Sequence, residues 1–244
     1  MLKKYSTHIK FILLFLLMAF LFGFAKIRNA DKMINEIDMT FKNGENLFIT
    51  YDSVNKLLIQ KIEPLKKQLI DSLNLNSIEK AVQSNEMIKN IEVFYTSDGK
   101  LGAEITQRTP VLRVVEGFDS YYIDENGLKM PLSMNYSARV PITYGKSEVT
   151  EYMQIANFAN KIREDSFLQK QIIGIEQEEN KRVGQFRLKT RIGDQIIVFG
   201  NLQNFENKKN KLKVFYQKAL KDSVLHRYDT INLMFKNQVV CTKK

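Results

Sequence analysis

The chain of 244 residues is 44% hydrophobic and 26% charged, which suits one or two globular domains with a packed core. Its 37 basic and 27 acidic residues give a formal net charge of +10, and a dispersed excess of this kind fits an anionic membrane surface or an acidic partner. The single cysteine, Cys241, excludes an internal disulfide, and no zinc-ligand spacing occurs.

Residues 11–25 carry no charge and follow a short tail that contains Lys3, Lys4 and Lys10. As a helix, residues 9–27 would span roughly 28 Å, close to the ~30 Å hydrocarbon core of a bilayer. This pattern predicts a cytoplasmic tail over residues 1–10 and a transmembrane helix over residues 11–27, with anchor residues Phe11, Leu14, Leu17, Leu21 and Phe24. A cleavable signal peptide ending at Ala25 is the alternative, and both alternatives export the remaining chain.

The next stretch predicts the order strand, helix, helix, strand, strand. Alternation over residues 36–41 indicates a strand, and Thr50 is the expected N-cap of a helix that is interrupted at Pro64 and followed by an amphipathic piece over residues 65–73. Asn76 with Glu79 resembles a capping box. The strands that follow are expected over residues 91–95 and 101–107, joined by a hairpin at Asp98-Gly99.

A longer, strand-rich region follows a seam near Thr109-Pro110. One helix is expected after Ser147, with an apolar stripe at Tyr152, Ile155, Phe158, Ala159 and Ile162. A second, lysine-rich helix is expected over residues 205–222. The predicted strands cover residues 111–115, 121–124, 139–144, 172–176, 184–191, 195–199 and 230–240. The fold class is therefore α+β, with a mixed α/β sheet in the terminal domain.

Residue types that carry chemistry are scarce. His226 is the only histidine outside the tail, and its neighbours Asp222 and Asp229 have no accompanying serine or cysteine motif. Gly145-Lys146-Ser147 imitates the end of a phosphate-binding loop but lacks the glycine that such a loop needs five residues earlier. We expect no catalytic, metal or cofactor site, and hence no enzyme.

Two surface features remain as candidates for binding. Six lysines form a basic helix surface, which is either a solvated face or a contact for lipid headgroups or an acidic partner: Lys208, Lys209, Lys211, Lys213, Lys218 and Lys221. The strand over residues 230–240 is expected at a sheet edge, where its main chain would accept a strand from another protein. Its outward side chains would then set specificity.

Several motifs resemble the FtsQ/DivIB family of bacterial cell-division proteins, and the resemblance covers essentially the whole chain. Gln107-Arg108-Thr109-Pro110 is similar to the family's motif at the end of its POTRA domain, and Tyr121-Tyr122-Ile123-Asp124 with Gly127 is similar to its hairpin. Arg139-Val140-Pro141 with Gly145 and the ending Ile231-Asn232-Leu233-Met234-Phe235 also match. In that ending, Asn232 and Met234 replace an acidic and a basic residue of the family pattern.

The resemblance implies a non-enzymatic divisome scaffold in the inner membrane at the division septum, with its N-terminus in the cytoplasm and its bulk in the periplasm. It also implies a POTRA-like βααββ domain over residues 32–109 and a β domain over residues 110–244. The expected partners are an FtsB/FtsL-type coiled-coil pair, other divisome components and membrane lipid, without nucleic acid, cofactor or small-molecule substrate. Carried over by position, the partner-binding residues are Ile231, Asn232, Leu233, Met234, Phe235, Lys236, Gln238 and Val240. A POTRA-type chaperone or translocation module for exported polypeptides is the alternative.

Overall fold

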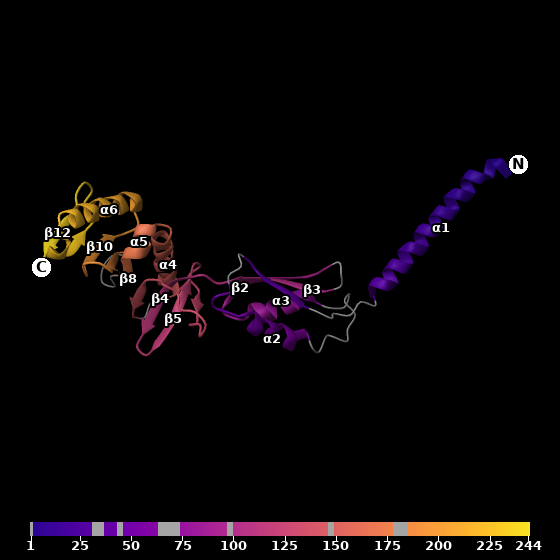
Figure 1. Cartoon of the computed structure of the whole chain (residues 1–244), viewed down its shortest axis with the longest axis horizontal. Helices are drawn as coiled ribbons and strands as arrows, with labels where there is room; N and C mark the ends of the chain where they lie inside the picture. The colour runs from indigo at the N-terminus through magenta and orange to yellow at the C-terminus, as the bar shows by residue number, and fades with distance from the viewer. Residues whose placement is uncertain are drawn as a thin grey trace. The chain divides into compact units, whose positions relative to one another are not determined.

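The structure is a computed structural model of the chain (Figure 1). It describes residues 2–30, 37–42, 46–62, 74–96, 100–145, 149–177 and 185–244. The contacts divide the chain into two compact units, residues 1–107 and 108–244.

The N-terminal part of the first unit is a long helix, α1 (Leu2–Ala30). The anchor residues expected from the sequence all lie on it with exposed side chains: Phe11, Leu14, Leu17, Leu21 and Phe24. Among the residues that the structure describes, no helix combines the length and the apolar character needed to cross a membrane.

The remainder of the first unit has the predicted βααββ order. It consists of β1 (Ile37–Phe41), α2 (Tyr51–Ile62), α3 (Leu75–Gln83), β2 (Ile88–Tyr95) and β3 (Leu101–Gln107). The sheet order is β1-β3-β2, in which β1 runs parallel and β2 antiparallel to the central strand β3. Figure 1 shows α2 and α3 beside this sheet, and their buried residues Val54, Leu58, Ile78 and Val82 form one core with it.

Short polar side chains begin both helices of this module. Thr50 Oγ1 accepts a hydrogen bond from Ser53 N at 3.3 Å, which confirms the predicted cap of α2. The prediction for α3 was wrong by two residues, because Asn74 is the N-cap and accepts from Ser77 N at 3.2 Å. Glu79 therefore does not close a capping box; its carboxylate instead accepts from Val93 N of β2 at 2.7 Å.

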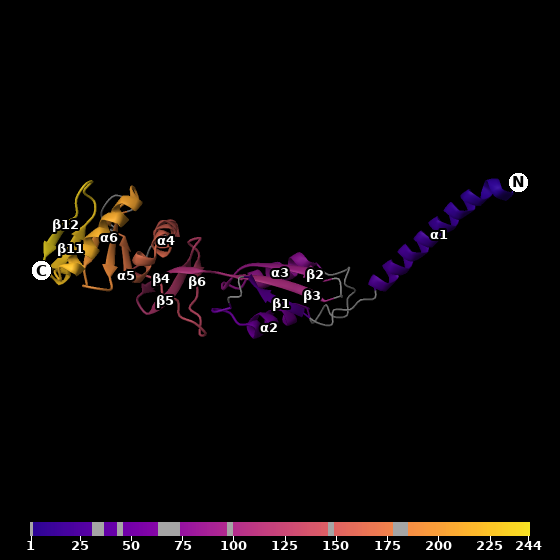
Figure 2. The ribbon, with the colours of Figure 1, turned by 45° about the horizontal axis from the view of Figure 1, so that its top comes forward.

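The second unit is built on a nine-stranded mixed sheet with the order β12-β11-β10-β9-β8-β7-β4-β5-β6. In chain order its strands are β4 (Pro110–Glu116), β5 (Asp119–Asp124), β6 (Lys129–Met130), β7 (Ile142–Tyr144), β8 (Ile172–Gln177), β9 (Phe186–Thr190), β10 (Ile196–Gly200), β11 (Tyr228–Asn232) and β12 (Val240–Lys243). The helices are α4 (Val149–Arg163), α5 (Ser166–Gln171) and α6 (Phe205–Lys221) (Figure 2). The predicted α+β class is therefore confirmed.

One hydrophobic core joins the three helices of this unit to its sheet. The predicted stripe of α4 is buried throughout. Its Phe158 ring lies 4.6 Å from the ring of Phe186, 4.9 Å from that of Phe199 and 6.1 Å from that of Phe205, measured between centroids. This aromatic cluster fixes α4, the sheet and the start of α6 against one another.

Some expectations differ from the structure or lie outside its described part. The strand predicted over residues 139–144 begins only at Ile142, because residues 139–141 lead into it without strand pairing. The short elements α5, β6 and a 3₁₀ turn at Leu225–Arg227 were not predicted. The predicted amphipathic piece over residues 65–73, the Asp98-Gly99 turn and the Ser147 cap lie outside the described residues.

Candidate partner-binding edge

The end of the chain forms a hairpin. The expected single strand over residues 230–240 is wrong: β11 ends at Asn232, residues 233–239 form a loop, and β12 returns antiparallel to β11. On its other side β11 pairs in parallel with β10. The strand at this edge of the sheet is therefore β12, whereas β11 lies one position inside.

The main chain of β12 presents hydrogen-bonding groups at the outer edge. Lys244 N donates to Arg227 O at 2.9 Å, and Thr242 and Val240 lie opposite Thr230 and Asn232 of β11. Because alternate residues of a strand direct their main-chain groups to the same side, Cys241 and Lys243 direct theirs away from β11. Among the described residues, no strand pairs with β12 on that outer side.

The residues expected to bind a partner fall into two groups. Ile231 and Leu233 are fully buried in the core, and Leu233 N donates to Val198 O of β10 at 3.0 Å, so their side chains do not reach the surface. Asn232 is half-buried, and its side chain accepts from Met234 N at 2.9 Å. The remaining members are exposed on the loop and at the start of β12: Met234, Phe235, Lys236, Gln238 and Val240.

A lysine of α6 attaches the loop to the body of the unit. Lys211 Nζ donates to Leu233 O at 3.1 Å and to Phe235 O at 2.6 Å. Both acceptors are main-chain carbonyls that strand pairing does not satisfy after β11 has ended. This lysine therefore holds the first half of the loop near α6.

The other lysines of α6 do not form the single continuous basic surface that the sequence suggested. Lys208 is buried, and its Nζ donates to Asn201 O at 2.8 Å; burial lowers the pKa of its ammonium group. Lys213 Nζ lies 2.6 Å from Asp165 Oδ2, and Lys209 lies between Asp165 and Glu206. Only the last part of the helix, with Lys218 and Lys221, has lysines that are exposed.

Asp165 links the N-terminus of α5 to α6. Its Oδ1 accepts from Phe167 N and Leu168 N, both at 3.1 Å, which caps α5. Burial pushes the pKa of its carboxyl group upward, but the hydrogen bonds from Lys213 and Leu168 N outweigh this effect and leave the pKa below its ordinary value. Two lysines of the supposed binding face thus serve the internal packing of two helices.

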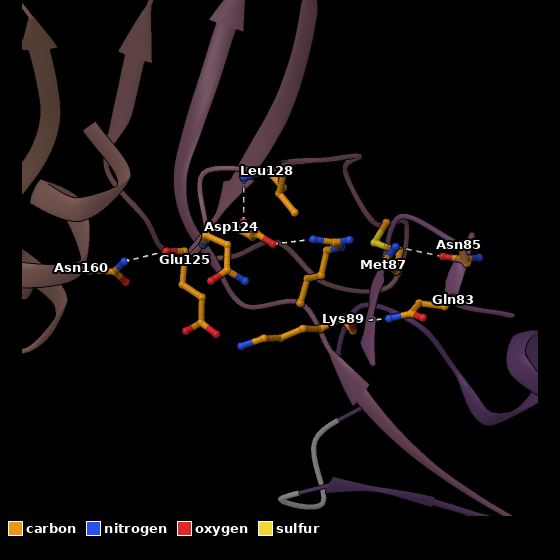
Figure 3. Close-up of polar contacts among 10 residues, drawn as sticks. Gln83, Asn85, Met87, Lys89, Asp124, Glu125, Leu128 and Asn160 are labelled. Carbon is orange, nitrogen blue, oxygen red and sulfur yellow. Dashed lines mark hydrogen bonds and ion pairs between the residues drawn. The ribbon is translucent and has the colours of Figure 1, made fainter. Parts of the chain in front are cut away.

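A second polar cluster lies at the start of the unit. Asp124 is completely buried, and its Oδ2 lies 2.7 Å from Arg108 Nη1. Its Oδ1 accepts from Asn126 N at 2.9 Å and from Leu128 N at 2.8 Å. Figure 3 shows this turn, in which Glu125 O accepts from the side chain of Asn160 of α4 at 3.0 Å. The Asp124 carboxylate therefore organises the β5–β6 turn and fixes Arg108.

Three of the four motifs that carried the resemblance meet through the main chain around β4. Thr109 O accepts from Glu125 N at 3.1 Å, which joins the first motif to the second. Pro141 O accepts from Arg113 N at 2.9 Å, which joins the Arg139-Val140-Pro141 motif to β4. The motifs are thus structural: they attach the β5–β6 turn and the entry to β7 on either side of β4.

The two remaining candidates for chemistry, His226 and Cys241, lie on different elements. His226 is exposed on the 3₁₀ turn, and Cys241 is half-buried in β12, where burial raises the pKa of its thiol. Among the described residues, no group of three histidine, cysteine, aspartate or glutamate side chains could hold a metal ion. Sequence reasoning missed β12 as the edge strand; the polar run Lys236-Asn237-Gln238 was the signal that could have revealed a hairpin.

Two family models match the chain. One, described as FtsQ/DivIB, C-terminal related, covers residues 109–242, and the other, described as a POTRA-like domain, covers residues 34–106. Among solved structures, the chain is similar to the major extracytoplasmic domain of the trans isomer of the bacterial cell division protein DivIB from Geobacillus stearothermophilus. The identity is 9% over 34% of this chain and 71% of that chain, with a TM-score of 0.28. The comparison with curated proteins finds no match.

Proposed function

Because this chain belongs to the FtsQ/DivIB, C-terminal related, family, we propose that it is a non-enzymatic scaffold of the bacterial division machinery. The family match confirms the resemblance read from the sequence, and a POTRA-like domain precedes it in the chain. The scaffold would link division proteins through its POTRA-like module and its β domain, and it would act at the division septum.

The observation that carries this proposal is the open edge at β12. The outward N–H and C=O groups of Cys241 and Lys243 can extend the sheet by one strand from another protein. In β-augmentation the main chain supplies affinity and neighbouring side chains supply specificity. The exposed Met234, Phe235 and Val240 lie at the loop and at the start of β12, where they can contact such a strand.

The proposed occupant of this edge is an extended segment of the FtsB/FtsL-type pair. The partner-binding set then changes from the one expected at first. Main-chain groups of Cys241 and Lys243 carry the pairing. The flanking surface consists of Met234, Phe235, Lys236, Gln238 and Val240, and the buried Ile231 and Leu233 support it from the core.

A matched pair of variants at one position tests the edge. Lys243→Pro removes an outward N–H, and proline is tolerated on edge strands, so pairing with β11 should survive. Loss of one hydrogen bond of about 0.5–1.5 kcal/mol should weaken partner binding roughly two- to twelvefold, measured by titrating the partner pair into the detergent-solubilised chain. Lys243→Ala changes only the side chain and should stay within about twofold of the unchanged protein. If Lys243→Pro and a chain without residues 233–244 both bound the partner pair as tightly as the unchanged protein, the β12 edge would be ruled out as the binding site.

We also propose that α1 anchors the chain in the inner membrane as a single pass, with the N-terminus in the cytoplasm. The exposed apolar side chains along residues 11–24 support this proposal, because they would be solvated poorly in water. Intact-mass measurement of membrane-extracted protein should give a chain that still begins at Met1 or Leu2. A chain that begins at Lys26, or release from membranes at alkaline pH, would contradict the anchor.

The POTRA-like match also favours a second candidate, a chaperone or translocation module for exported polypeptides. Localisation in dividing cells separates the two functions. A fluorescent fusion of the full chain should gather at midcell if the chain is a division scaffold. A uniform distribution along the envelope would favour the translocation module.

A further inference from the structure

A basic pocket opens within the sheet region of the second unit, away from the β12 edge. Its volume is about 360 Å³. Three cationic side chains line it, each from a different segment: Arg139 before β7, Lys170 near the end of α5 and Arg191 after β9. Its aliphatic lining includes Ile142, Ile172 and Ile173. The strands β7, β8 and β9 occupy the middle of the sheet order, whereas β12 lies at one end.

The main chain that carries two of these cations is held in place by hydrogen bonds. Arg191 N donates to Gln171 O at 2.7 Å, and the buried Gln171 side chain donates to Ile192 O at 3.1 Å. The segment of Arg139 is tied to β4 through Pro141 O and Arg113 N. A ligand would therefore meet a largely preorganised backbone, which lowers the entropic cost of binding.

The charges of the pocket are uncompensated. Arg139, Lys170 and Arg191 are exposed, and in the described parts of the chain none of them forms an ion pair. The described lining contains no acidic residue. Ile173 is 40% exposed at the same place, so apolar surface and positive charge lie together. This combination is complementary to an anionic group attached to an aliphatic one.

We propose that this pocket binds an acidic peptide segment of a partner protein, with one aliphatic side chain on the isoleucines and flanking carboxylates on Arg139, Lys170 and Arg191. Guanidinium groups match carboxylates in a bidentate geometry. The volume lies at the lower end of the roughly 300–1,000 Å³ typical of ligand sites, which suits one or two side chains better than the acyl chains of a lipid. The site is separate from strand pairing at β12 and could be occupied at the same time.

A fluorescence-anisotropy titration with the full chain in zwitterionic nanodiscs tests the proposal. The probe is a labelled peptide Glu-Asp-Leu-Asp-Glu, and the neutral peptide Gln-Asn-Leu-Asn-Gln is the control. Arg139→Gln and Arg191→Gln should each weaken binding roughly two- to fivefold, the range for exposed ion pairs, and the double variant should weaken it further. Ile173→Ser should also weaken it, because the aliphatic contact is lost. The matched control is Lys218→Gln with Lys221→Gln on α6, which should leave binding unchanged.

The outcomes separate specific binding from general attraction between charges. Equal binding of the neutral peptide, equal loss in the α6 control, or no loss in Ile173→Ser would overturn the proposal, as would absence of peptide binding. Inorganic phosphate and phosphatidylglycerol vesicles form two further arms. Binding of either through Arg139 and Arg191 without peptide binding would assign the pocket to phosphate, free or as a lipid headgroup, and would also overturn it. Unchanged far-ultraviolet circular dichroism of each variant shows that its fold is retained.

Discussion

Replacing Asp124 is the most direct test of how the second unit is held together at its start. Its carboxylate is fully buried and accepts from Arg108, Asn126 N and Leu128 N. Asp124→Ala leaves the guanidinium and two main-chain N–H groups without their acceptor. Asp124→Asn keeps one amide oxygen for the N–H groups, but it places an NH2 donor opposite Arg108 where the carboxylate had accepted. The two variants therefore separate the loss of the Arg108 contact from the loss of the turn.

The expected loss in the free energy of unfolding follows from the burial of the Arg108–Asp124 ion pair. Removing one partner of a buried ion pair costs about 3–5 kcal/mol, and the 17% exposure of the Arg108 side chain places this pair at the lower end. Each main-chain N–H that loses its acceptor adds about 1 kcal/mol. We therefore expect Asp124→Ala to lower the free energy of unfolding of the second unit by about 4–5 kcal/mol and Asp124→Asn by about 2 kcal/mol.

A neighbouring pair supplies a matched control. Arg163 Nη2 and Glu125 Oε2 lie 3.3 Å apart, with side chains 38% and 25% exposed. An exposed pair of this kind contributes at most about 1 kcal/mol, so Glu125→Gln should cost less than that. The contrast tests whether burial, and not the mere presence of an ion pair, sets the cost.

Urea unfolding followed by pulsed hydrogen exchange and mass spectrometry measures the effect in each unit separately. Peptides from residues 108–244 should shift to lower urea, whereas peptides from residues 37–107 act as an internal reference. A loss below about 1 kcal/mol for Asp124→Ala, or a loss equal to that of Glu125→Gln, would refute the reasoning.

Three further predictions concern the loop, the helices and one glycine. Lys211→Met removes two hydrogen bonds to the loop, so it should raise hydrogen exchange of residues 234–239 about tenfold while leaving β11 protected, whereas Lys218→Met should change neither. The pKa of Asp165 is lowered in the folded state, so its stabilising effect is complete above the ordinary value near 3.8 and is lost as the pH falls below it. Asp165→Asn should therefore make the free energy of unfolding depend less on pH in that acidic range. Urea midpoints measured at several pH values test this. Gly127→Ala should lower the free energy of unfolding by about 1–2 kcal/mol, because φ is +79° and the new Cβ would lie 2.9 Å from Met153 Cγ. A urea midpoint equal to that of the unchanged protein would contradict this.

Periodicity predicted most of the regular structure. The α4 stripe at Tyr152, Ile155 and Phe158 is buried as expected, because a helix of four turns has one apolar face that only the core can cover. The order of the first unit followed in the same way from short alternating runs separated by capped helices. The helix α5 was not predicted, because its six residues are too few to display the 3.6-residue apolar period of a helix.

The candidate site was harder to predict for two physical reasons. The alternation of apolar and polar residues continues through Leu233 and Phe235, although the strand pairing of β11 ends at Asn232. The sequence pattern alone therefore predicts a strand that is too long. The acceptors of Lys211 are main-chain carbonyls 22 and 24 residues away, and a sequence pattern does not contain such long-range contacts. The same holds for the pocket, whose cations come from three separate segments.

The brevity of β12 limits how tightly any strand can be held there. Four residues, of which two direct their main-chain groups outward, offer an incoming chain about four hydrogen bonds, or roughly 2–6 kcal/mol in total. Association costs at least about 4 kcal/mol in lost freedom of motion. If a partner strand binds at this edge, its capture there alone would therefore be transient. Durable assembly would then need a second point of attachment, and release of either contact would let the complex dissociate.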